Sequence, residues 1–340
     1  MSQSIRFFSE IPGFMEFEDQ VKVMDSIAEW SEKYGFYGAL FYYSHSSLDP
    51  WISASRIIQK TDRLVPLIAT QPYVMSPLQV AKMVSTISVL FGRQVCLNLI
   101  AGVSETEQAS ANQSLSASER YVRIEEYITV LKELLSSAGK SCNYSGQYYK
   151  FNGVSLKPGL NPLHMPEFFV PGSSKDSIRV AHAQAGSALV RPEPIDSFKE
   201  KYVSHIDRTR LNLGIRIAVL ARPTSEEAWK DAEKLFPETR SGRLSMVLKK
   251  SLTSENSKQM VDLALNQTLY DNVYWMGAYS SGMSTDPYLV GSYQEVADYL
   301  QEYIDCGVTT ILLGDLYTED GFFHFSQVKE LLTNQIRENA

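Results

Sequence analysis

Short apolar runs alternate with amphipathic helical patterns along most of the chain, and this alternation constrains the fold more than any other feature. The runs expected to form strands fall at residues 5–8, 38–41, 64–69, 95–100, 167–171, 188–190, 213–221 and 308–313. Continuous apolar runs of this length are typical of strands covered on both faces, as in parallel sheets. Strands that alternate with helices are joined by right-handed crossovers, and eight of them close into a barrel. We therefore predict an α/β fold, a (β/α)8 TIM barrel with inserted segments.

Capping residues predict where several helices begin and end. Ser76, which is followed by proline, is expected to open a helix, and Gly92 is expected to close it in a left-handed conformation. Ser118 is the expected N-cap of a later helix. The run S-Y-Q-E that starts at Ser292 has the spacing of a capping box. These signals place helices between the predicted strands, as a barrel requires.

The length of the chain fits one barrel domain, over residues 1–340, with two insertions. A chain of 340 residues with 44% apolar composition can bury a large core, and α/β barrels commonly have this size. Residues 136–157 are polar and rich in tyrosine, glycine and asparagine, and we expect a hairpin there. Residues 238–272 are polar and show few strand signals. A connection of that length is unusual in a compact domain, so we interpret it as an insertion or a lid.

Charge and cysteine content limit the classes of function. The net charge of -7 and the isoelectric point of about 5.4 argue against a nucleic-acid-binding surface. The three cysteines are an odd number without C-x-x-C spacing, which is typical of a reducing compartment. The sequence shows no signal-peptide pattern and no apolar window of membrane-spanning length, so we expect a cytoplasmic protein. The five histidines lack metal-ligand spacing, and we expect no metal.

Polar residues at the ends of predicted strands are the candidates for binding and catalysis. Gly172, Ser173 and Ser174 follow the fifth strand and open a helix, where free N–H groups suit a phosphate, although glycine and serine are also ordinary caps. Asn98 lies in a buried strand and must either bond to neighbouring backbone or face a ligand. Arg216 lies in an apolar strand, so it is expected to meet a carboxylate or an anionic ligand.

The segment around the third and fourth strands resembles a known family. It reads L-I-A-T-Q-P-Y-V-M-S-P-L-Q-V-A-K-M-V-S-T-I-S-V-L-F-G-R and is followed by N-L-I-A-G and S-E-R-Y. These motifs are similar to those of the bacterial-luciferase-like flavin monooxygenases, and within that family they are nearest to the alkanesulfonate monooxygenase branch. They occur in the family's order and at its spacing, and the resemblance extends over most of the chain.

The resemblance implies roles for the residues that match. The implied cofactor contacts are Gly172, Ser173, Ser174 and Tyr121 at the FMN phosphate, and Ala69, Thr70 and Asn98 at the flavin ring. The implied catalytic residues are Arg216 and His45, where His45 replaces the arginine of the branch's R-S-C-x-D-x-W motif. The implied substrate contacts are Ser47, Trp51, Arg191 and Tyr317. A structural salt bridge is the alternative for Arg216, and an exposed loop histidine is the alternative for His45.

The function that the resemblance implies is that of a monooxygenase. Such an enzyme receives reduced FMN from a separate NAD(P)H-dependent flavin reductase and uses dioxygen, through a peroxyflavin intermediate, to oxidise a small-molecule or carrier-bound substrate. A homodimer or larger homo-oligomer is expected from the same resemblance. Two alternatives stay open: a deazaflavin-dependent oxidoreductase of the same barrel family, and a flavin-binding accessory protein without turnover.

Simple alkanesulfonates are not the expected substrates. After Arg216, the seventh strand carries Ala218 where the alkanesulfonate branch has a histidine, and the loop at 279–283 lacks that branch's arginine. Arg191 stands where the branch has a tryptophan and is the one new source of positive charge. We therefore expect a substrate that is larger, less anionic or presented on a carrier.

Overall fold

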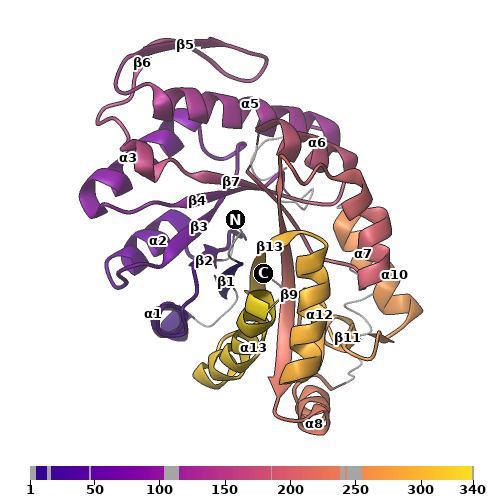
Figure 1. Ribbon diagram of the computed structural model, residues 1–340. Helices are drawn as coiled ribbons and strands as arrows, with labels where there is room; N and C mark the ends of the chain where they lie inside the picture. Colours follow the sequence, from indigo (N-terminus) through magenta and orange to yellow (C-terminus); the bar gives the residue numbers. More distant parts are fainter. Residues whose placement is uncertain are drawn as a thin grey trace.

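The computed structural model describes residues 5–13, 17–45, 47–102, 115–184, 186–237, 242 and 255–338. A closed barrel of eight parallel strands lies at its centre (Figure 1). The barrel strands are β1 (Arg6–Ile11), β2 (Gly38–Phe41), β3 (Val65–Thr70), β4 (Cys96–Leu99), β7 (Glu167–Pro171), β8 (Ser187–Val190), β9 (Asn212–Arg222) and β13 (Val308–Gly314). They pair in chain order, and β13 returns to pair with β1. The predicted TIM barrel is confirmed, and each predicted strand overlaps one of these eight.

Helices surround the barrel (Figure 1). They are α1 (Phe17–Lys33), α2 (Pro50–Ile58), α3 (Pro77–Phe91), α5 (Ala117–Ser136), α6 (Lys175–Gln184), α7 (Ile195–Lys201), α8 (Ser225–Leu235), α10 (Glu255–Asn266), α11 (Gly277–Ser280), α12 (Tyr293–Asp305) and α13 (Glu319–Glu338). Ser76 caps α3, and Gly92 ends it with a φ of +62°, as predicted. The predicted N-cap Ser118 is wrong, because the N-cap is Ser116, two residues earlier, which forms a capping box with Glu119.

Several elements lie outside the simple alternation. The insert predicted at 136–157 contains the expected hairpin, formed by β5 (Ser141–Ser145) and β6 (Lys150–Ser155). Three short strands extend the sheet beyond β9: β10 (Leu269–Tyr270), β11 (Tyr274–Trp275) and β12 (Tyr288–Ser292). The sequence analysis predicted none of these strands. β10 and β11 have two residues each and carry no periodic signal, and β12 has only five residues. β9 is long enough to pair with β13 along its first half and with β12 along its second half.

A layer of apolar side chains crosses the inside of the barrel. They come from seven of the eight strands and are Phe8, Leu40, Leu67, Cys96, Phe169, Leu189 and Leu312. All are at most 5% exposed. The larger core lies between the strands and the surrounding helices. This layer separates the two ends of the barrel, and active sites of TIM barrels lie at the C-terminal ends of the strands.

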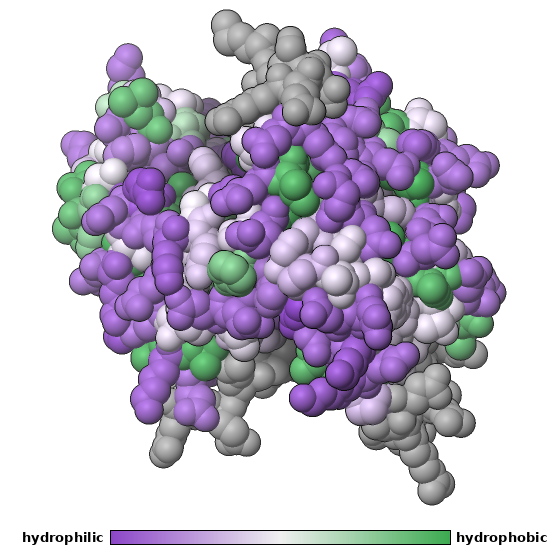
Figure 2. Space-filling view, turned by 60° about the horizontal axis from the view of Figure 1, so that its bottom comes forward, coloured by the Kyte–Doolittle hydropathy of each residue, from purple (hydrophilic) through white to green (hydrophobic). Residues whose placement is uncertain are grey.

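The predicted insertion at 238–272 is only partly described. Residues 238–241 and 243–254 lie outside the described residues, and the remainder forms α10 and β10, with Met260 and Val261 of α10 buried in the core. None of the helices in the described part of the chain is long and apolar enough to span a membrane. On the face shown in Figure 2, hydrophilic residues dominate and hydrophobic ones are scattered, so this face offers no broad apolar surface.

Candidate active site

A cavity of about 420 Å³ lies at the C-terminal ends of the barrel strands. The ends of β2, β3, β4, β7 and β8, the middle of β9 and the start of α10 contribute to its wall. Leu40 and Leu189 belong both to this wall and to the apolar layer inside the barrel, so that layer forms the floor. Six residues predicted from the sequence line the cavity: Ala69, Asn98, Tyr121, Gly172, Arg191 and Arg216. Active sites of TIM barrels lie at this end.

One corner of the cavity has the geometry that a phosphate requires. Gly172 follows β7 with a φ of +128°, a backbone conformation that residues other than glycine rarely adopt. A Cβ atom at this position would lie 2.9 Å from the hydroxyl of Tyr121 and 3.1 Å from the side chain of Ser177. The hydroxyl of Ser174 accepts a hydrogen bond of 3.1 Å from the backbone N–H of Ser177 and so caps the first turn of α6. At this corner a phosphate could therefore come close to the backbone, and the start of α6 provides the positive end of a helix dipole.

A second part of the wall carries an unsatisfied buried oxygen. Asn98 pairs in register with Ala69 across β3 and β4, so the two residues lie side by side near the ends of their strands. The Asn98 side chain is 7% exposed, and its Oδ1 atom has no hydrogen-bond partner among the described residues. Because an unpaired buried oxygen is costly, a ligand N–H group would stabilise it. The polar edge of a flavin ring supplies such a group, so the residues present fit this cofactor.

A buried charged cluster forms the part of the wall next to β9. Arg216 donates through Nη2 to both carboxylate oxygens of Glu10, at 3.0 and 2.9 Å, and through Nε to Oδ2 of Asp286 at 2.9 Å. Nε of Arg191 lies 3.1 Å from the other oxygen of Asp286. The side chain of Asp286 is fully buried. The prediction that Arg216 meets a carboxylate is confirmed, and the cluster contains two cations and two anions.

Burial and neighbouring charges shift the protonation of this cluster. Burial raises the pKa of Glu10 to about 7, although the charge of Arg216 opposes the shift. Burial alone would lower the pKa of Arg216, but the charges of Asp286 and Glu10 outweigh it and raise that pKa. Behind the cluster, burial also raises the pKa of Asp315. Glu10 is therefore the group of the cluster that titrates near neutral pH.

Comparison with known proteins establishes the family. The family model described as luciferase-like monooxygenase matches residues 15–310. The chain belongs to this family. A relative from Niallia circulans, 4-(gamma-L-glutamylamino)butanoyl-[BtrI acyl-carrier protein] monooxygenase BtrO, is 35% identical over 337 residues, which cover 98% of each protein. The chain is thus a luciferase-like monooxygenase along nearly its whole length.

Two solved structures show the same fold with different cofactors. Riboflavin lyase, in complex with modified FMN and riboflavin, gives a TM-score of 0.79 at 17% identity, covering 98% of this chain and 92% of that one. An F420-dependent secondary alcohol dehydrogenase, in complex with an F420-acetone adduct, gives a TM-score of 0.70 at 15% identity. The match covers 97% of this chain and 99% of that one. At these identities the likeness shows the fold alone. Luciferase-like proteins use flavins, either FMN or the deazaflavin F420.

The luciferase-like barrel places the other predicted residues outside the cavity wall. His45 is an exposed turn residue whose ring packs edge-on against Tyr43. Ser47 donates from its hydroxyl to the backbone oxygen of Ser44, and Trp51 is buried in the core at 3% exposure. The Thr70 hydroxyl donates to the backbone oxygen of Ile68 at 3.1 Å.

The remaining predicted residues lie next to the site and bond to other protein groups. The Ser173 hydroxyl donates to Oε1 of Gln259 at 2.8 Å. The Tyr317 hydroxyl donates to Asp315 at 3.3 Å, behind the charged cluster. Both positions are one step removed from the cavity. Their contact with a ligand therefore remains a prediction.

Several site residues escaped the sequence analysis. The first strand was predicted to end at residue 8, so Glu10 was not recognised as a polar residue at a strand end. Asp286 comes from the segment before β12, which carried no strand signal, and Tyr279 belongs to the loop that was considered only for its missing arginine. Asn256 and Ser257 line the cavity from the start of α10, within the segment predicted as a lid. The one available signal was Arg216, whose burial requires carboxylate partners somewhere in the chain.

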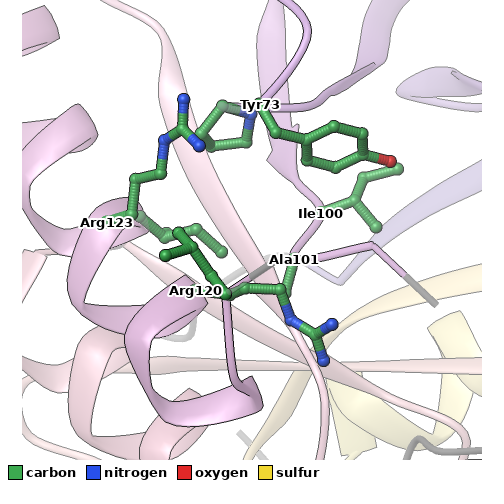
Figure 3. Close-up of a pocket in the computed structure, with 8 residues that line it drawn as sticks. Tyr73, Ile100, Ala101, Arg120 and Arg123 are labelled. Carbon is green, nitrogen blue, oxygen red and sulfur yellow. The ribbon is translucent and has the colours of Figure 1, made fainter. Parts of the chain in front are cut away.

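A small cleft of about 10 Å³ adjoins the cavity and shares Tyr73, Ile100 and Ala101 with it (Figure 3). Arg120 and Arg123 reach it from α5, but Figure 3 shows their guanidinium groups pointing in different directions. Arg123 donates from Nε to the hydroxyl of Tyr149 at 3.0 Å. The two guanidinium groups do not point toward one place, so they do not form a binding site for a single anion in this cleft.

The unpaired oxygen of Asn98 leads to a prediction in which stability and ligand binding move differently. We expect Asn98→Leu to leave the free energy of unfolding of the flavin-free protein unchanged or slightly higher, because it removes an unsatisfied buried polar atom. The same change should weaken flavin binding about tenfold, since one hydrogen bond is lost. Denaturant unfolding and flavin titration measure the two effects.

The control for this prediction is a satisfied buried hydroxyl. Thr61 donates to the backbone oxygen of Ile57 at 2.8 Å, away from the cavity. Thr61→Val should cost about 1 kcal/mol of stability and leave flavin affinity unchanged. If Asn98→Leu instead lowers stability as much as Thr61→Val and spares flavin binding, Asn98 is a structural residue.

Proposed function

We propose that this luciferase-like monooxygenase uses reduced FMN and dioxygen to oxidise an acyl group carried on an acyl carrier protein. The observation that carries the proposal is the cavity, where the Gly172 phosphate corner and the unpaired Asn98 oxygen share one wall. The relative whose printed name includes an acyl-carrier-bound substrate is 35% identical over 98% of both chains and supports the choice of substrate class.

The residues present suit the phosphate and the ring of FMN. Gly172, Ser173 and Ser174 would hold the phosphate at the start of α6, with the hydroxyl of Tyr121 beside it. Asn98 and the neighbouring Ala69 would contact the ring. When bound, reduced FMN supplies two electrons to dioxygen, so that one oxygen atom enters the substrate and the other leaves as water. The chain itself binds the cofactor, orients the substrate and excludes water.

We also propose a partner and a location for the enzyme. A separate NAD(P)H-dependent flavin reductase would supply reduced FMN. A cytoplasmic location agrees with the three cysteines, which are all free and buried. Two alternatives have specific outcomes. A deazaflavin-dependent oxidoreductase would bind F420 in place of FMN, and an accessory protein would bind FMN without oxidising a substrate.

We expect simple alkanesulfonates to be poor substrates. The positive charge of Arg216 is matched by Glu10 and Asp286, and Ala218 supplies no hydrogen-bond donor. The loss of two charge-assisted hydrogen bonds costs about 3 to 6 kcal/mol, or roughly two to four decades in affinity. The measurement is sulfite released per reduced FMN oxidised, over a panel of short and medium alkanesulfonates. Efficient, coupled sulfite release would place the chain in the alkanesulfonate branch after all.

The proposed function is tested with isotopically labelled dioxygen. The chain, reduced FMN and a 4-(gamma-L-glutamylamino)butanoyl group are combined, with the acyl group attached either to a carrier protein or to pantetheine alone. We expect mass spectrometry to find one labelled oxygen atom in the acyl group, and faster incorporation on the carrier protein. Flavin oxidation without label in either acyl group would reject the proposal for this substrate class.

A further inference from the structure

Two arginines on the cavity wall share one buried carboxylate. Nε of Arg191 lies 3.1 Å from Oδ1 of Asp286, and Nε of Arg216 lies 2.9 Å from Oδ2. Asp286 is fully buried, whereas the side chains of Arg191 and Arg216 retain 24% and 16% of their exposure. Asp286 therefore accepts a hydrogen bond from Nε of Arg216 and forms an ion pair with Arg191. Both arginines line the cavity.

This arrangement leaves N–H groups of both arginines available to a ligand. Arg216 uses Nη2 for Glu10 and for the hydroxyl of Thr285. Among the described residues, no hydrogen bond occupies Nη1 of Arg216 or either Nη atom of Arg191. The backbone of Arg191 is also fixed, because its carbonyl oxygen accepts a 3.1 Å hydrogen bond from Asn256. The free donors of Arg216 thus belong to a hydrogen-bonded guanidinium group, and those of Arg191 belong to a group held by its ion pair with Asp286.

The charge of the cluster selects the kind of ligand. With Glu10 and Asp286 ionised, the charges of the two guanidinium groups and the two carboxylates sum to zero, so the cluster offers donors with little net positive charge. Protonation of Glu10, whose pKa burial raises to about 7, leaves one net positive charge. A sulfonate relies on net positive charge, because its oxygens are weakly basic acceptors. A carboxylate is a stronger acceptor, and its planar pair of oxygens matches the guanidinium fork.

We infer that Arg191 and Arg216, oriented by Asp286, form a subsite that binds a carboxylate group of the substrate. Arg191 is the specificity-determining residue, and Asp286 is a positioning residue. The inference rests on the proposed function and deepens it. The oxidised acyl group carries a carboxylate at a distance from its attachment to the carrier, and this cluster recognises it.

The test uses the full chain without flavin and a matched pair of probes. Glutarate carries carboxylates, and glutaramide is its neutral counterpart of similar shape. Calorimetric titration should show binding of glutarate and much weaker binding of glutaramide. Arg191→Met should weaken glutarate binding about ten- to a hundredfold, and Arg191→Lys should have an intermediate effect, since it keeps the charge but not the fork. Arg179→Met, which removes a surface ion pair with Glu125, is the matched control and should change nothing.

A second variant separates positioning from structural damage. Asp286→Asn makes the cluster net positive while keeping a polar side chain between the arginines. We expect it to weaken glutarate binding and to improve binding of propanesulfonate, a gain that general damage to the fold would not produce. Equal binding of glutarate and glutaramide to the unmodified chain, or unchanged glutarate affinity in Arg191→Met, would overturn the inference.

FMN affinity and glutarate affinity are measured separately, because they test different sites. If Arg191→Met lowers FMN affinity and spares glutarate, the arginine belongs to the flavin phosphate and the inference is wrong. If glutarate binds as expected but no oxygen is incorporated into a carrier-bound acyl group, the proposed function fails while the carboxylate subsite stands.

Discussion

Arg216→Met is expected to lower the free energy of unfolding by about 3 to 5 kcal/mol, because it leaves the buried carboxylates of Glu10 and Asp286 without their main partner. The loss should depend on pH. In the native protein Glu10 has a pKa of about 7, raised by burial above its ordinary value, and the change removes the cation that opposes this rise. A carboxyl group with a raised pKa in the folded state destabilises that state as the pH rises toward that pKa. The loss should therefore be larger at pH 8 than at pH 6.

The control is an arginine of the same strand. Arg222 pairs with Asp231 at 2.7 Å, but Asp231 retains 39% of its exposure, so Arg222→Met should cost about 1 kcal/mol or less. The double change Glu10→Gln with Arg216→Met should recover part of the stability, since one of the two unpaired charges is removed. Denaturant unfolding at both pH values measures all four proteins. A loss no larger than that of Arg222→Met would mean that water reaches the cluster.

Gly172→Val is expected to weaken FMN binding about a hundredfold. The φ of +128° is strained for any other residue, and the added Cβ would lie 2.9 Å from the hydroxyl of Tyr121. The loop must therefore move away from the position in which its backbone meets the phosphate, and each 1.4 kcal/mol lost is a factor of ten in affinity. Fluorescence titration of FMN measures the effect.

The matched control is a glycine with positive φ that lies away from the cavity. Gly92 has a φ of +62°, and a Cβ atom there would have no neighbour within 4 Å. Gly92→Val should lower stability through backbone strain and leave FMN affinity unchanged. Equal FMN affinity in Gly172→Val and in the unmodified chain would reject the phosphate corner.

The barrel was predictable because its signals are local. Continuous apolar runs marked all eight strands, and the caps at Ser76, Gly92 and Ser292 marked helix boundaries, since each depends on residues a few positions apart. The Gly172 corner was predictable for the same reason, because glycine, serine and a helix start follow one another in sequence. The exception was Ser118, where a neighbouring serine with better spacing to Glu119 took the cap.

The charged cluster was only half predictable, because its members are far apart in the chain. An arginine in an apolar strand required carboxylate partners, but nothing local in the sequence identified Glu10, 206 residues away, or Asp286, 70 residues away. His45 and Trp51 show the opposite case. Their motif matched by spacing, yet the turn exposes His45 and α2 buries Trp51 in the core, away from the cavity wall.

The most direct test of the account is the choice of cofactor and its reaction with oxygen. The chain is titrated without oxygen with reduced FMN and with reduced F420, and the FMN complex is then mixed rapidly with air-saturated buffer. We predict that reduced FMN binds more tightly than F420, and that its reoxidation on the protein passes through a species whose absorbance differs from that of free flavin. Preference for F420, or reoxidation of bound FMN identical to that in solution, would contradict the account.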